Sequence, residues 1–161
     1  MRTSGLRGPQ RASVKIPAQS LLINATDEQR MSFVYCVSAT NIVHKLAGQM
    51  VSRNKHWLYK PKVFAGQKEQ LDSSVAAMIE VHQRFLETLS HDQADALNKN
   101  LAEMAHLQSE LNARMAQIDK GWASSEPDAR SIAVSVHEIR KIADEWRFEL
   151  EQIARAVNLS E

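Results

Sequence analysis

The chain has 161 residues, of which 43% are hydrophobic and 24% charged, values typical of one folded domain with its own core. Five Gly and four Pro are too few for a turn-rich β fold, and a single cysteine, Cys36, excludes an internal disulfide. The net charge of +1 conceals an asymmetry. Residues 1–62 hold ten Lys or Arg and two Asp or Glu (+8), whereas residues 63–161 hold ten Lys or Arg and seventeen Asp or Glu (−7). This split indicates either an anionic partner for the basic part or neutralisation of one part by the other.

No stretch of the sequence is suited to spanning a membrane. The longest run without charge, Met31 to His44, is too short and too polar to span a bilayer. Basic residues occur at the N-terminus, but no apolar segment follows them as in a signal peptide. We therefore expect a cytoplasmic protein, in which Cys36, between Tyr35 and Val37, is a buried and unreactive thiol.

Residues 1–25 predict a basic, mostly irregular tail, and residues 26–161 predict a helical bundle. The first helix is expected over about 27–53, because Thr26 and Gln29 have the spacing of a capping box. Its first half is apolar nearly all round. Such a helix is expected to be buried on most sides, either as the innermost helix or in an oligomer contact.

A basic and aromatic connection follows, and Pro61 and Gly66 mark it as a loop. Its candidate partner-binding or anion-binding residues are Arg53, Lys55, His56, Trp57, Tyr59, Lys60 and Lys62. Cations attract phosphates, and the two aromatic rings suit stacking on unpaired bases or a position at the headgroups of an acidic membrane surface. The alternative interpretation is that Trp57, Leu58 and Phe64 close the end of the bundle while the lysines keep the loop soluble.

Two further helices are expected over about 67–89 and 91–120, separated by a capping-box pattern at Ser90 and Gln93. Each has a continuous apolar row along one side, which we call a seam. The seams are Leu71, Val75, Met78, His82, Phe85 and Leu89, then Leu97, Leu101, Met104, Gln108, Leu111, Met115, Ile118 and Trp122. Because neither Gly nor Pro enforces the break, one long helix over 67–120 is an alternative.

The last helix is expected over about 126–157, with Ser125 as its cap and Pro127 in its first turn. Its seam has alternating spacings of four and three: Ile132, Val136, Ile139, Ala143, Trp146, Leu150, Ile153 and Val157. Charged residues fill the positions between. The helix must therefore lay this seam against other helices.

Two histidines fit metal sites only weakly. His82 lies at a seam position, where an imidazole needs a hydrogen-bond partner, and Gln108 is chemically suitable. Glu103 and His106 have the Glu-x-x-His spacing of di-iron bundles, but the motif occurs once and both residues flank the seam residue Met104. The sequence therefore predicts neither a metal nor a cofactor.

Arg130 and His137, seven residues apart, share one face of the last helix. The pair resembles the Arg-(x)4–6-His pattern of HEPN ribonucleases, which are also helical bundles that pair their last helices around the site. The resemblance covers these two residues only. It implies an acid/base role for His137 and phosphate binding by Arg130.

The sequence predicts an all-α fold, an antiparallel up-and-down four-helix bundle with coiled-coil-like seams, or a three-helix bundle if 67–120 is one helix. The leading functional interpretation is a non-catalytic interaction or assembly protein that self-associates or binds a protein partner through its seams. The first alternative is binding of nucleic acid or an anionic surface through residues 53–62 and the tail. The second is a HEPN-like ribonuclease that uses Arg130 and His137.

Overall fold

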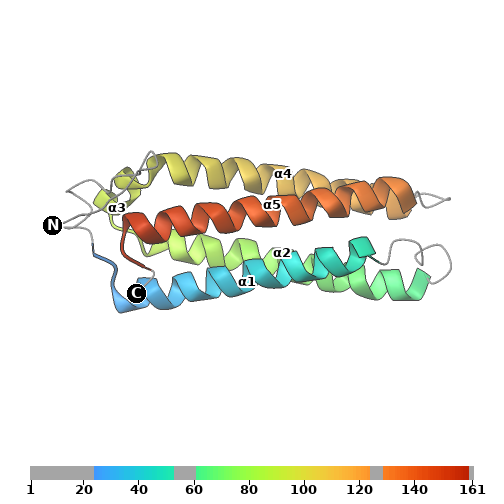
Figure 1. Cartoon of the computed structure of the whole chain (residues 1–161), viewed down its shortest axis with the longest axis horizontal. Helices are drawn as coiled ribbons and strands as arrows, with labels where there is room; N and C mark the ends of the chain where they lie inside the picture. The colour runs from blue at the N-terminus through green and yellow to red at the C-terminus, as the bar shows by residue number, and fades with distance from the viewer. Residues whose placement is uncertain (1–23, 53–60, 124–128, 160–161) are drawn as a thin grey trace.

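Four long helices and one short helix make up the computed structural model, which describes residues 24–52, 61–123 and 129–159 (Figure 1). They are α1 (Asp27–Ser52), α2 (Pro61–Glu87), α3 (His91–Ala96), α4 (Asn98–Ala123) and α5 (Ala129–Ala156). No helix in the described ranges is long and apolar enough to cross a membrane.

The four long helices run alternately up and down (Figure 1), and the prediction of an all-α helical bundle is confirmed. Residues near the start of α1 contact residues near the end of α2. For example, the ring centroids of Phe33 and Phe85 are 5.7 Å apart. Asn100 near the start of α4 donates a hydrogen bond to Glu149 near the end of α5. The backbones of α1 and α2, α1 and α5, and α4 and α5 approach closely over much of their lengths.

The break between the second and third predicted helices is real, so the alternative of one helix over 67–120 is wrong. α2 ends at Glu87, and Ser90 caps a new helix that begins at His91. This new helix is itself interrupted at Leu97, whose backbone (φ −97°, ψ 10°) departs from helical geometry between α3 and α4. Neither Gly nor Pro stands there. The interruption therefore left no signal in the sequence.

One predicted helix start needs correction, and another is not tested. α2 begins at Pro61 and not at Gln67, because proline fits the first turn of a helix, where its missing N–H would have no partner. Gly66 is consequently a residue within α2 rather than part of a loop. α5 begins at Ala129, and the predicted start at 126 lies outside the described residues.

The predicted α5 seam is the centre of the core. All eight of its residues are buried, and Trp146 has no exposed surface. In α4, however, Leu107 is buried and the predicted seam residue Gln108 only half-buried. A leucine can occupy this core position without a hydrogen-bond partner, which a glutamine would need.

Both predicted capping boxes are present, and they are joined to each other. Thr26 N–H donates to Gln29 Oε1 (2.9 Å), and Ser90 N–H donates to Gln93 Oε1 (2.9 Å). The two buried glutamines also exchange hydrogen bonds: Gln29 Nε2 donates to Gln93 Oε1 (2.7 Å), and Gln93 Nε2 donates to Gln29 Oε1 (3.1 Å). These paired capping boxes fasten the start of α1 to the start of α3 at one end of the bundle.

Candidate interaction surface

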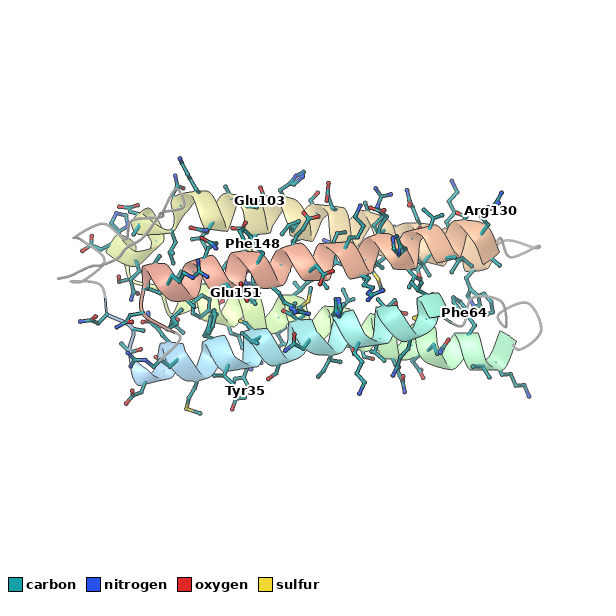
Figure 2. All side chains as sticks on the ribbon, viewed as in Figure 1. Tyr35, Phe64, Glu103, Arg130, Phe148 and Glu151 are labelled. Carbon is teal, nitrogen blue, oxygen red and sulfur yellow. The ribbon has the colours of Figure 1, made fainter. Side chains whose placement is uncertain are left out.

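One side of α1 presents apolar side chains to solvent. Met31, Val34, Tyr35 and Ile42 are between 52% and 61% exposed, and Ser38 lies among them. We call these five residues the α1 outer face. Figure 2 shows Tyr35 at the edge of the bundle, pointing away from the other helices. α1 is therefore not the innermost helix of the bundle, and its burial in an oligomer contact, the other expectation, stays a prediction.

The opposite side of α1 packs into the core, where Phe33, Cys36, Val43, Ala47 and Met50 are buried. Buried Thr40 satisfies its hydroxyl by donating to the Cys36 carbonyl oxygen (2.7 Å). Burial raises the pKa of the Cys36 thiol to about 12. The prediction that Cys36 is buried is confirmed, and a thiol with that pKa has little nucleophilic thiolate at neutral pH.

Charges of opposite sign stand at the two ends of the α1 outer face. Glu28 lies before Met31, and Lys45 lies after Ile42; both are exposed. Among the described residues, neither of them forms an ion pair. By contrast, Asp27 is 3.6 Å from Arg30, and on the side toward α5 the imidazole of His44 lies 2.9 Å from the Asp144 carboxylate. Glu28 and Lys45 are thus two charges available to a partner.

Other exposed apolar residues in the described ranges do not form such a row. Val63 stands on α2, while Val134 and Phe148 lie about four turns apart on α5. Figure 2 shows Phe148 on α5, apart from Tyr35 on α1. Apolar residues scattered singly over a surface are normal, whereas a contiguous row indicates a contact site.

His82 is buried in the core, as its seam position predicts, but the expected pairing with Gln108 is not formed. His82 Nδ1 has no hydrogen-bond partner in the described structure, and neither has Nε1 of Trp146. The two rings meet edge to face with centroids 5.1 Å apart. Burial lowers the His82 pKa to about 4, so the imidazole is neutral at pH 7.

The other sequence candidates on described helices do not converge. Arg130 and His137 are both exposed on the outer side of α5, and Figure 2 shows Arg130 at the N-terminal end of that helix. Glu103 and His106 are exposed on α4, where His106 lies 3.2 Å from Glu110. Within the described ranges, no three His, Cys, Asp or Glu side chains are grouped so that they could hold a metal ion.

Most of the predicted basic loop lies outside the described residues. This applies to Arg53, Lys55, His56, Trp57, Tyr59 and Lys60. Lys62 is exposed on α2, and Phe64 is fully buried with its ring 4.6 Å from that of Trp122. Phe64 therefore packs into this end of the bundle, and anion binding by the loop remains a prediction.

Comparison with known proteins identifies no relative: no protein family, no curated protein and no solved structure matches this chain. The interpretation of the surface consequently depends on its own geometry.

The α1 outer face was not among the candidate residues of the sequence, although its signal was present. Residues 31, 35, 38 and 42 repeat at helical spacing, as do the buried residues on the opposite side of α1. The apolar content of the first helix predicts burial on most sides, either as the innermost helix or in an oligomer contact, but this prediction does not separate the two rows. Separating the two rows would have predicted one row for the core and one for a contact.

Proposed function

We propose that this protein is a non-catalytic helical assembly protein that binds a protein partner through the α1 outer face. The observation that carries the proposal is the row of four large apolar side chains, each more than half exposed, along one helix. A contiguous exposed apolar row costs free energy in water, and association removes that cost.

The sequence predicts contact through the helix seams, with an oligomer contact of the first helix as a further possibility. The residues of the α5 seam are all buried within a single chain. A seam that already packs inside the bundle is not available to a partner. The α1 outer face is available, and its spacing suits a helix of the partner.

Site-specific photocrosslinking tests this proposal. A photoreactive phenylalanine analogue in place of Tyr35 is compared with the same analogue in place of Phe148, an aromatic residue of equal exposure (57%) on α5. We expect adducts of higher mass with another protein chain from position 35 and few from position 148. Absence of an intermolecular adduct at position 35 in the cell would contradict the proposal.

A further inference from the structure

Six exposed residues on the outer side of α1 form a pattern whose spacing is the same in both directions. In order they are Glu28, Met31, Tyr35, Ser38, Ile42 and Lys45, with spacings of three, four, three, four and three. Reversing the order leaves the spacing unchanged. The midpoint of the pattern lies between residues 36 and 37.

The chemistry of the pattern is self-complementary about the same midpoint. When two copies of α1 are laid antiparallel, Met31 of each chain stands opposite Ile42 of the other. The large Tyr35 stands opposite the small Ser38, and the acid Glu28 opposite the base Lys45. Apolar residues thus meet apolar residues, a large side chain meets a small one, and each charge meets its opposite.

We infer that the occupant of the α1 outer face is a second copy of this chain, with the two α1 helices antiparallel about a two-fold axis. This inference rests on the proposed function, because it names the partner of that surface. A two-fold arrangement uses the same patch on both chains, as the pattern requires. A parallel arrangement would instead place Glu28 against Glu28 and Lys45 against Lys45.

The charges of Glu28 and Lys45 cannot serve each other within one chain. They lie seventeen positions apart along α1, and a helix rises 1.5 Å per residue, so they are about 25 Å apart. Each is exposed and forms no ion pair with a described residue. In the antiparallel dimer each finds a partner, and this happens twice because of the symmetry.

The size of the surface sets the expected strength. One helix against one helix gives a small interface, so we expect a reversible dimer with a dissociation constant on the order of micromolar. Sedimentation velocity of the full chain at low ionic strength, over a series of protein concentrations, measures this equilibrium.

Charge reversal tests the antiparallel geometry. Glu28→Lys places like charges opposite each other at both ends of the dimer, and so does Lys45→Glu. Each single variant should weaken self-association by about tenfold, and an equimolar mixture of the two should recover it, because every pair in the mixed dimer is again opposite in charge. Matched controls are Glu69→Lys on α2 and Lys99→Glu on α4, both exposed. These should dimerise like the unaltered chain.

Two results in the association measurements overturn the inference. One is a chain that stays monomeric up to hundreds of micromolar, well above the range expected for such an interface. The other is a mixture of the two variants that associates no better than either alone. Crosslinking at position 35 separates the possibilities: adducts only with a different protein leave the proposed function standing and reject the second copy. A crosslink confined to one chain, for example to residues 1–23, rejects both.

Discussion

α1 and α5 lie side by side in the bundle, and both carry regular apolar rows, but they use them differently. α5 has one seam, all of it buried, and exposes mainly charged residues on its other side. α1 has two rows, one in the core and one in solvent. The number of apolar residues in a helix therefore does not tell how much of it is buried. The number of separate rows indicates how many surfaces the helix contacts.

The largest effect on stability is expected at the largest side chain of the α5 seam. Trp146→Ala should lower the free energy of unfolding by about 3–5 kcal/mol, because it leaves a large cavity in the core. Phe148→Ala, two residues further along the helix and 57% exposed, should change it by less than about 0.5 kcal/mol. Urea unfolding followed by circular dichroism measures both. Equal effects would show that the two sides of α5 do not differ as described.

The contact between His82 and that seam should make the bundle sensitive to acid. The folded-state pKa of His82 is about 4, below the ordinary value of 6.5, so the unfolded chain binds a proton more readily. Above about pH 6.5 the His82 imidazole is neutral in both states, and the bundle has its full stability. As the pH falls toward 4, the unfolded chain takes up a proton first, and up to about 3 kcal/mol of the free energy of unfolding is lost.

Comparing two histidine variants separates the contribution of His82 to acid sensitivity from the contribution of the carboxylates. His82→Leu should flatten the dependence of unfolding free energy on pH between 6.5 and 4. It should keep or raise the stability at pH 7, because it removes a buried nitrogen that has no partner. His137→Leu on the exposed side of α5 should leave the acid sensitivity intact. An unchanged pH profile for His82→Leu would contradict the depressed pKa.

A smaller loss is expected where α1 is anchored at its start. Gln93→Ala removes one member of the paired capping boxes, deletes the two hydrogen bonds between Gln29 and Gln93, and takes the side-chain acceptor away from the Ser90 N–H. We expect a loss of about 1–3 kcal/mol in the free energy of unfolding. Gln83→Ala, at an exposed position of α2, is the matched control and should change it little. Equal losses in the two variants would contradict an anchoring role for the paired boxes.

Local rules recovered most of the bundle from the sequence. Spacing alone identified the α5 seam, and capping chemistry placed the starts of α1 and α3, because these signals are local. The joining of Gln29 to Gln93 across 64 residues could not be predicted, since each capping box is complete by itself and nothing local shows that the two meet. The interruption at Leu97 could not be predicted, because no Gly or Pro marks it. The burial of Leu107 in place of Gln108 could not be predicted either, because both positions fit the helical periodicity almost equally well.

The candidate surface was harder to predict for a related reason. The exposure of the α1 outer face depends on which helices pack around α1, and periodicity does not contain that information. The bundle uses the row that contains Val43 and Met50 and leaves the row that contains Met31 and Ile42 uncovered among the described residues.

The smallest effect on the free energy of unfolding is expected for Tyr35→Gln. This variant also decides whether the outer row of α1 contacts a partner or packs within its own chain. In a dilute monomer its exposed ring contributes little to the fold, so the free energy of unfolding should change by less than about 0.5 kcal/mol. Self-association measured at high concentration should nevertheless weaken. A loss of 2 kcal/mol or more in the dilute monomer would mean that Tyr35 packs against part of its own chain. The outer row would then be a second internal seam, and α1 would be the same kind of helix as α5.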